Sequence, residues 1–203
     1  ESELCYIDGD AGRLIYRGYT IEDLAREASF EEVCYLLWNA RLPAPDELET
    51  FTNTMADERG LADGVIDLLT DLAAADEAPM AALRTATSML SAADPEPDAD
   101  PEDLEATQRM GRRITAKLPT IVAAYDRLRS GEQPVEPDPT LSHAANFLYM
   151  LTGVVPDDVA AETFDMALTL HADHGLNAST FTTLVIVSTY ADVYSAVDRK
   201  SVV

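Results

Sequence analysis

Helical periodicity is the feature of this 203-residue chain that most restricts its fold. From about residue 20 onward, apolar residues recur at the spacing of a helix with one buried face, and not at every second position as in a half-buried strand. Only the N-terminus differs, where short apolar runs at 5–7 and 14–16 flank a turn rich in Gly and Asp. The pattern therefore predicts an all-α protein with a short N-terminal β-hairpin.

Start and stop signals divide the helical part into segments. Thr20 with Asp23 forms a capping pair that begins one short helix. Ser29 with Glu32 forms another, which begins a second. Further helices are expected at residues 46–59, 63–75, 79–92, 101–130, 141–153, 157–174 and 177–197. The loops between them are short for domain linkers, so residues 1–197 are expected to belong to one helical domain.

Acidity is the main peculiarity of the composition. The chain has 37 Asp and Glu residues against 14 Lys and Arg residues, a formal net charge of -23. Such a charge repels the phosphates of nucleic acid, which is therefore not expected as a partner. Concentrated salt screens this kind of self-repulsion, because the Debye length falls to about 3 Å at 1 M. The acidity favours a salt-adapted cytoplasm, with an ordinary acidic protein as the alternative.

Neither a membrane nor an oxidising compartment is indicated. No apolar run approaches the roughly 18 residues of a membrane span, and the opening ESELCYIDGD is too polar for a signal peptide. Cys5 and Cys34 have no CxxC spacing and no histidine neighbour, so they predict neither a metal framework nor a disulfide scaffold. We therefore expect a soluble cytoplasmic protein with reduced thiols and no membrane partner.

The segment HADHGLNAST at 171–180 holds two of the three histidines. On a helix that runs to residue 174, His171 and His174 share the apolar face that points inward. Gly175 then stops this helix, and Asn177 or Ser179 is suited to cap the next one. Imidazoles at one helix end, beside the free backbone N–H groups of another helix, predict a pocket for a carboxylate.

Three interpretations of this cluster remain open from spacing alone. A metal site would use His171 and His174 with Asp173. However, Asp173 cannot share their face, and His143 is the only other histidine. A second interpretation is a set of polar residues that are satisfied inside a helical core and have no chemical task. The third, which the density of polar residues favours, is binding of a small anion or oxo-acid.

Four segments resemble the citrate synthase family, in the family's own order. HADHGLNASTF resembles its histidine-containing segment, and IDGDAGRLIYRGYTIEDLA followed by FEEVCYLLWNARLPAPDEL resembles its N-terminal signature. APMAALRTATSML is similar to its next helix, and HAANFLYMLTG to the segment upstream of the histidines. The resemblance covers nearly all of residues 4–197 and implies the N-terminal part of the family's large helical domain. The type is archaeal or bacterial, and the acidity favours a haloarchaeal one.

The resemblance also implies roles for residues of the histidine segment. His174 is expected to contact oxaloacetate or the citrate product, and Asn177 helps to hold the same ligand. Ser179 matches a serine that orients a catalytic histidine further along the family's chain, and His171 has a supporting role. Five residues of the N-terminal signature are expected to serve the hairpin and its docking, and not chemistry: Asp8, Gly9, Tyr16, Arg17 and Gly18.

The implied reaction is an acyl transfer. Citrate synthases condense acetyl-CoA with oxaloacetate and hydrolyse the citryl-CoA to citrate and CoA, with no metal and no cofactor, since acetyl-CoA is a substrate. The family also implies a homodimer. The nearest alternative is 2-methylcitrate synthase, which uses propionyl-CoA on the same fold. A non-catalytic helical interaction module is an alternative from another class.

The C-terminus departs from the family. After YSAV the family continues into a Gly-Pro-His-Gly segment whose histidine polarises the acetyl-CoA carbonyl, and then into a smaller domain with a catalytic aspartate. This chain ends in DRKSVV instead. Residues 198–203 are therefore expected to be an atypical tail. The chain is expected to be an inactive fragment with part of the oxaloacetate site and no catalytic residue.

Overall fold

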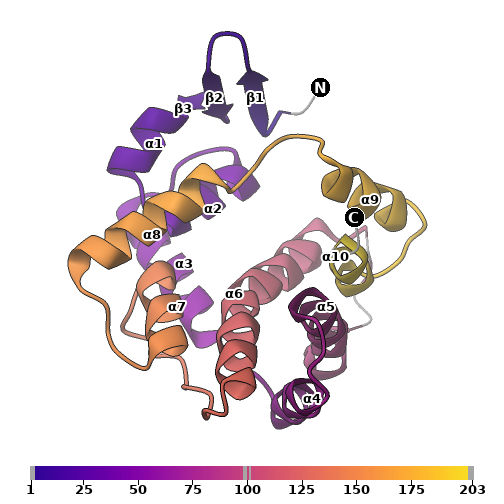
Figure 1. Cartoon of the computed structure of the whole chain (residues 1–203). Coiled ribbons are helices and arrows are strands. Elements are labelled where there is room, and N and C mark those ends of the chain that lie inside the picture. Colours follow the sequence, from indigo (N-terminus) through magenta and orange to yellow (C-terminus); the bar gives the residue numbers. More distant parts are fainter. Residues whose placement is uncertain (1–2, 98–99, 101, 201–203) are drawn as a thin grey trace.

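A long helix, α6 (Leu104–Arg129), runs through the middle of the computed structural model of the chain (Figure 1). The structure describes residues 3–97, 100 and 102–200. The strands are β1 (Cys5–Asp8), β2 (Arg13–Tyr16) and β3 (Tyr19–Thr20). The other helices are α1 (Ile21–Glu27), α2 (Phe30–Asn39), α3 (Pro45–Asp57), α4 (Asp63–Ala74), α5 (Pro79–Met89), the 3₁₀ helix η1 (Leu90–Ala93), α7 (His143–Thr152), α8 (Asp158–Leu170), α9 (Ala178–Val187) and α10 (Val193–Lys200). The predicted all-α fold with a small N-terminal sheet is confirmed.

Capping signals act where the sequence predicts them. The Ser29 side chain accepts from the backbone N–H of Glu32 at 3.2 Å, and the Glu32 carboxylate accepts from the N–H of Ser29 at 2.8 Å. Thr20 accepts from the N–H of Asp23 in the same way. The predicted starts of α1 and α2 are thus confirmed. The start predicted at residue 101 for α6 lies outside the described residues.

The N-terminal hairpin is present and gains a third strand. β1 and β2 pair antiparallel, with Cys5 opposite Tyr16, and β2 pairs with β3. The connection from β2 to β3 uses Arg17 and Gly18, whose φ angles of 47° and 94° are both positive. A two-residue hairpin turn needs such angles, which glycine adopts without strain. The Arg17 guanidinium also donates to the carbonyl of Leu37 in α2, so the turn is tied to the helices.

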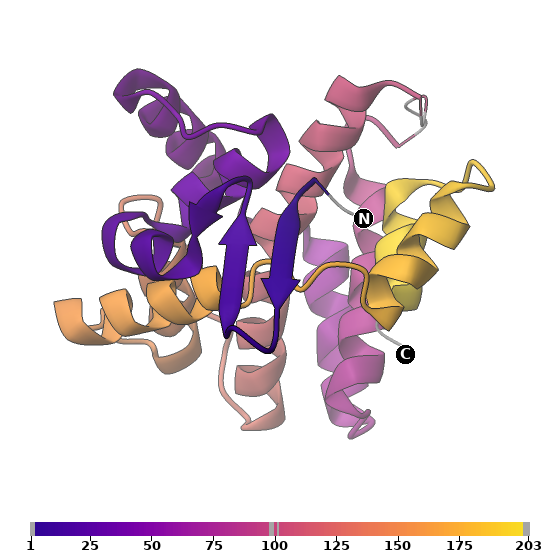
Figure 2. The ribbon, with the colours of Figure 1, turned by 90° about the horizontal axis from the view of Figure 1, so that it is seen from above.

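Two buried clusters hold the elements together. The first joins α4, α5, α6 and α10 around residues such as Leu69, Ile121 and Tyr194. The second joins the sheet to α1 and α2 around Tyr16, which is 0% exposed. Burial of these apolar faces supplies most of the driving force for folding. The sheet is therefore part of the body of the protein, and Figure 2 shows its strands lying over the segment between α8 and α9.

The phenol of Tyr16 binds that segment. It donates to the carbonyl of Asp173 at 2.9 Å and accepts from the N–H of Asp173 at 3.1 Å. In a continuous helix the N–H of Asp173 would instead donate to the carbonyl of Thr169. α8 ends at Leu170, since the N–H groups of His171 and Ala172 already donate three residues back. Because Tyr16 takes both backbone groups of Asp173, the helix does not continue through this residue. The helix predicted at 157–174 therefore extends four residues too far at its C-terminal end.

The predicted helix at 177–197 is also interrupted. It appears as α9 and α10, and Tyr190 in the link has a φ of 60°. The last turn of α9 tightens, since the N–H of Tyr190 donates to the carbonyl of Val187, three residues back. Apolar periodicity continues across this link, so it gives no signal for the break.

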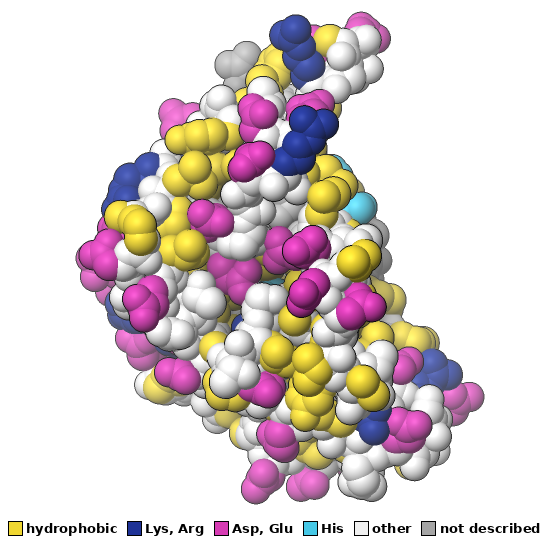
Figure 3. Space-filling view, turned by 90° about the vertical axis from the view of Figure 1, so that its left-hand side faces the viewer, with side chains coloured by type: hydrophobic (Ala, Val, Ile, Leu, Met, Phe, Trp, Pro, Cys, Tyr) yellow, Lys and Arg dark blue, Asp and Glu magenta, His cyan; other side chains and the backbone are white. Residues whose placement is uncertain are grey.

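The surface is acidic with apolar patches between the charges, as Figure 3 shows for one face. Four large apolar side chains of α9 are exposed: Phe181, Leu184, Val185 and Val187. All ten residues of α9 are described, and none is buried. Among the described residues, no helix is both long and apolar enough to cross a membrane.

We expect the surplus acidity to make stability depend on salt. Glu49, Asp67, Asp71 and Glu162 are among the exposed carboxylates that form no ion pair with a described residue. Replacing them with Gln and Asn should raise the denaturation midpoint at millimolar KCl, because like-charge repulsion acts over about 10 Å at 0.1 M salt. The variant should also gain less than the parent from molar KCl. Since salt strengthens apolar burial in both proteins, equal gains would contradict the electrostatic origin.

We further expect Tyr16→Phe to loosen the segment after α8. The change leaves the N–H and carbonyl of Asp173 without a partner, which should lower the free energy of unfolding by about 1–3 kcal/mol. Amide exchange at residues 171–177 should become faster, as hydrogen exchange would measure. Tyr19→Phe is the matched control, because its ring lies exposed in the same sheet. Equal exchange in the two variants would show that the Tyr16 hydroxyl does not hold the segment.

Candidate functional site

The candidate site is the loop from His171 to Asn177, which joins α8 to α9. The sequence predicts that His171 and His174 lie on the inward face of a helix, and this prediction is wrong. His171 is the C-cap residue directly after α8, and His174 lies in the loop beyond it. Both imidazoles are exposed. They still lie close together, with ring centroids 5.9 Å apart and the rings at 78°.

The two histidines differ in how they are held. Nδ1 of His171 lies 2.7 Å from the carbonyl oxygen of Ala167 in the last turn of α8. A carbonyl only accepts, so Nδ1 is the nitrogen that carries a proton in this contact, and Nε2 is the ring nitrogen left for other partners. His174 has no hydrogen bond to its ring from any described residue, and its contact is with His171. His174 is therefore the freer donor toward a ligand, which agrees with a supporting role for His171.

Asn177 and Ser179 lie where the second helix begins. The side-chain oxygen of Asn177 accepts from the N–H of Thr180 at 2.8 Å and so caps α9. Its Nδ2 group donates to no described residue and stays available to a ligand. Ser179 lies in the first turn of α9, and its hydroxyl likewise has no partner among the described residues. The first turn also offers free backbone N–H groups at the positive end of the helix dipole.

Strand β1 packs against the loop at Gly175. Gly175 has a φ of 70°, and a Cβ atom there would lie 3.5 Å from Sγ of Cys5. Burial, together with the neighbouring Asp173 carboxylate, raises the pKa of the Cys5 thiol to about 11. The thiol therefore stays protonated at neutral pH and is a packing residue and not a nucleophile. One carboxylate oxygen of Asp173, Oδ2, is buried without a hydrogen-bond partner among the described residues.

The sheet residues of the N-terminal signature serve structure, as predicted. The Asp8 carboxylate accepts from the N–H of Ala11 and stabilises the β1–β2 turn. Tyr16 docks the sheet on the loop, and the Arg17–Gly18 pair forms the second turn. None of these side chains presents a group to the exposed imidazoles. These contacts are the structural ones that the sequence predicts, but the sequence does not indicate that Tyr16 keeps α8 from continuing through Asp173.

α8 is attached to α2 by a carboxylate. Oδ2 of Asp165 accepts from the backbone N–H of Phe30 at 3.0 Å, at the start of α2. Burial, and next the charge of Glu31, raise the pKa of Asp165 to about 6. This contact fixes the position of α8, and with it the point from which the candidate loop departs. No signal in the sequence pairs Asp165 with Phe30, which lies 135 positions away.

A metal centre is not supported by the described part of the chain. It contains no group of three or more His, Cys, Asp or Glu side chains placed to hold a metal ion. The third histidine, His143, begins α7 and packs against Phe30, with ring centroids 5.2 Å apart. Burial, and then the nearby Arg59 guanidinium, lower the pKa of His143 to about 4, so its ring is neutral at pH 7. Two exposed imidazoles, an amide donor and a helix N-terminus can hold a carboxylate.

Comparison with known proteins gives the same family over almost the entire chain. The family model described as citrate synthase, C-terminal domain, matches residues 1–198. The citrate synthase of Haloferax volcanii is 59% identical over 198 residues, which cover 97% of this chain and 52% of that protein. Citrate synthase 2 of Bacillus subtilis is 47% identical over 184 residues, 91% of this chain and 49% of that protein. The chain thus spans about half the length of the curated relatives that it matches.

Solved structures agree with the sequence comparison. The citrate synthase of Pyrobaculum aerophilum superposes with a TM-score of 0.94 at 40% identity, covering 100% of this chain and 52% of that one. A ternary complex of the Thermoplasma acidophilum citrate synthase with carboxymethyl coenzyme A and oxaloacetate superposes with a TM-score of 0.91 at 26% identity, covering 100% of this chain and 52% of that one. Since fold and sequence match together from the N-terminal sheet to α10, the chain belongs to the citrate synthase family.

Proposed function

We propose that this chain supplies part of the oxaloacetate site of a citrate synthase, an enzyme that condenses acetyl-CoA with oxaloacetate and water to give citrate and CoA. The observation that carries the proposal is the exposed imidazole of His174 beside the capped start of α9. It supports the proposal because oxaloacetate is a dicarboxylate, and the loop presents donors that no acceptor among the described residues occupies. The relative solved with oxaloacetate and a coenzyme A analogue adds support.

Each side chain of the loop has a role that follows from its contacts. His174 donates to a carboxylate or to the keto oxygen of oxaloacetate, and Nδ2 of Asn177 donates to the same ligand. The Asn177 oxygen is already used by Thr180, so this side chain has one orientation and its amino group points outward. His171, bonded to Ala167, limits where the His174 ring can lie. The free hydroxyl of Ser179 orients a further imidazole of the complete enzyme.

A 2-methylcitrate synthase is the second candidate. The enzyme of that name from Mycobacterium tuberculosis is 42% identical over 185 residues, 91% of this chain. The candidate loop is proposed to bind the oxo-acid, so it does not distinguish acetyl-CoA from propionyl-CoA. The two acyl groups differ by one CH₂, worth about 0.8 kcal/mol on burial. The higher identity to the Haloferax volcanii and Bacillus subtilis citrate synthases favours acetyl-CoA.

The remaining expectations from the sequence stay part of the proposal. We infer that residues 1–197 form the first part of the large domain, that 198–203 are an atypical tail, and that no metal or cofactor is required. The net charge of -23 and the 59% identity to a Haloferax protein support a salt-adapted, haloarchaeal-type cytoplasmic enzyme. The exposed apolar faces of α8 and α9 support a homodimer.

Binding of oxaloacetate to the chain tests the proposal. In a titration followed by NMR, the ring signals of His174 and the side-chain amide of Asn177 should shift. His174→Asn should weaken binding about tenfold or more, the cost of losing a hydrogen bond to a charged group. His171→Asn should weaken it less, because its Nδ1 is already bonded to Ala167.

Malate and Asn53→Ala provide the controls for this titration. Malate lacks the keto oxygen and should bind more weakly to the parent chain. Asn53 is an exposed residue of α3 outside the loop, and its replacement should leave binding unchanged. If oxaloacetate shifts no signal in 171–180, the chain does not carry the oxo-acid site, and a helical interaction module becomes the better description.

We expect no condensing activity from the 203-residue chain by itself. Asp173, the carboxylate of the loop, lies beside Cys5 with its Oδ2 buried, so this oxygen is not open to acetyl-CoA. The three histidines are assigned to the oxo-acid or to the core, which leaves no histidine to donate to the enolate oxygen. General base catalysis contributes about 10²–10⁴-fold, and electrostatic stabilisation contributes comparably. Oxaloacetate-dependent thiol release from acetyl-CoA above the blank would contradict this expectation.

A further inference from the structure

The position of α9 depends on α10. α9 packs mainly on α10, and each of its ten described residues is at least partly exposed. α10 in turn packs on α5 and α6. A helix without a buried face has little apolar packing of its own to fix its position. The start of α9, which bears Asn177 and Ser179, is therefore held indirectly.

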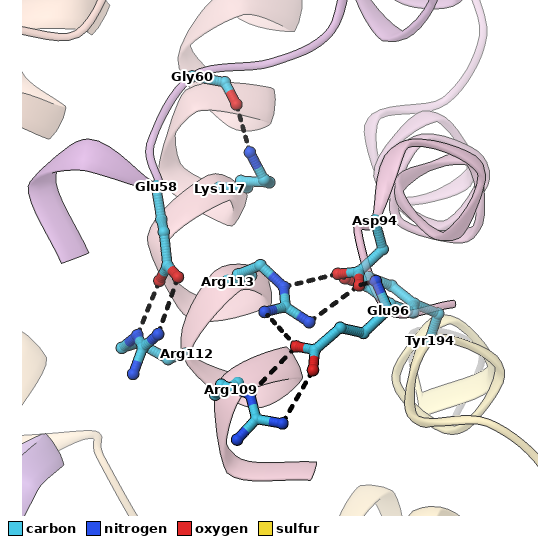
Figure 4. A network of polar contacts seen from close by, with 9 residues as sticks. All are labelled: Glu58, Gly60, Asp94, Glu96, Arg109, Arg112, Arg113, Lys117 and Tyr194. Carbon is cyan, nitrogen blue, oxygen red and sulfur yellow. Dashed lines mark hydrogen bonds and ion pairs between the residues drawn. The ribbon is translucent and has the colours of Figure 1, made fainter. Parts of the chain in front are cut away.

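A buried polar bond secures α10 to the body. The hydroxyl of Tyr194, in the first turn of α10, donates to Oδ2 of Asp94, which follows η1. Figure 4 shows the two side chains meeting between α10 and α6. Tyr194 is 2% exposed and lies in the same apolar cluster as Ile121 and Leu90. The bond joins residues that are 100 positions apart in the sequence.

Asp94 is held from a second side by α6. Nε and Nη2 of Arg113 donate to its two oxygens at 2.6 and 2.8 Å, and the backbone N–H of Glu96 donates to Oδ1 at 2.7 Å. With the Tyr194 hydroxyl, the carboxylate accepts four hydrogen bonds. The side chain of Asp94 is only 1% exposed. A buried carboxylate is tolerated when it is paired and fully hydrogen-bonded, and the geometry of such a cluster is then strongly restricted.

The cluster continues along α6 toward the surface. Nη1 of Arg113 donates to Glu96 at 3.2 Å, and Arg109 binds Glu96 through two further bonds of 3.1 and 2.8 Å (Figure 4). The acceptor of the Tyr194 hydroxyl, Asp94, is thus held directly by Arg113 and indirectly, through Glu96, by Arg109, both on α6. The Tyr194 hydroxyl therefore keeps its hydrogen bond only while α10 holds Tyr194 beside Asp94.

The segment from Asp173 to Tyr194, which contains the start of α9, is therefore held by a buried phenol at each end. Tyr16 binds the backbone of Asp173 before α9, and Tyr194 binds Asp94 after it. We propose that Tyr194 is a positioning residue for the oxo-acid site, acting through Asp94 and Arg113 to fix α10 and thereby the start of α9. Its effect on oxaloacetate rests on the proposed function, whereas its effect on α9 does not.

The polar bond can be separated from the packing of the ring. Tyr194→Phe keeps the aromatic ring in the core and removes only the hydroxyl. The matched control is Tyr125→Phe, because Tyr125 is 5% exposed in the same cluster and its hydroxyl donates to the carbonyl of Glu77, far from α9 in the sequence. Tyr190→Phe is the second control and removes an exposed bond to Glu102 from the α9–α10 link.

Amide exchange and histidine spectra measure the position of α9 without a ligand. Tyr194→Phe should speed exchange at residues 178–187 about tenfold, as expected for losing a hydrogen bond to a charged group. It should also move the ring signals of His174. Tyr125→Phe and Tyr190→Phe should leave both readouts near those of the parent, even where Tyr125→Phe lowers global stability. Exchange in 178–187 that is unchanged in Tyr194→Phe, or equally fast in Tyr125→Phe, overturns the proposal.

Oxaloacetate titration then separates this inference from the proposed function. With a binding-competent parent, Tyr194→Phe should raise the dissociation constant at a temperature where all variants are fully folded, and the two controls should not. Unchanged affinity together with faster exchange in 178–187 overturns the positioning role. If the parent fails to bind oxaloacetate, the proposed function fails, while the exchange experiment still decides whether Tyr194 holds α9.

Discussion

Packing against α6 is the constraint on which the rest of the structure depends. This 26-residue helix contacts α3, α4, α5, α7 and α10, so elements from both ends of the chain share one buried surface. It also carries six of the fourteen Lys and Arg residues: Arg109, Arg112, Arg113, Lys117, Arg127 and Arg129. The five arginines pair with carboxylates of other segments, among them Glu58, Asp76 and Asp94. The few cationic side chains of the chain thus join segments through ion pairs, and the remaining surface is acidic.

Local signals were sufficient to predict most of the helices. Ser29 with Glu32, Thr20 with Asp23 and the apolar period all act over a few residues, and the structure has helices where they indicate. The prediction for α8 failed where a distant side chain takes the backbone groups that would continue the helix, and the prediction for 177–197 failed at the link around Tyr190. The period that runs through Ala167 and His171 contains no sign that Tyr16, more than 150 positions earlier, takes the backbone of Asp173. Periodicity reports which face is apolar and not where tertiary bonds end a helix.

The same competition explains what was right and wrong about the candidate site. The motif places the predicted site in the loop between α8 and α9, and Asn177 caps α9 as predicted. The inward orientation of His171 and His174 was wrong because it assumed that the helix continues through both. The partners that hold the loop, Tyr16 before it and Tyr194 after it, could not be found by spacing, since each bond spans 100 residues or more. Composition predicted an acidic surface but not that arginines concentrate on α6.

The acidity of the chain bears on the proposed ligand. Oxaloacetate is an anion, and a protein with a net charge of -23 repels it at long range. At short range the start of α9 and the His174 imidazole attract it, since their dipoles and donors act within a few ångströms. Salt shortens the range of the repulsion to about 3 Å at 1 M, which is close to the length of a hydrogen bond, so direct contacts with the site are weakened less than the long-range repulsion. On the proposed function, salt that stabilises an acidic surface therefore also reduces the long-range repulsion of an anionic substrate. The surface charge and the chemistry of the site are thus both compatible with concentrated salt.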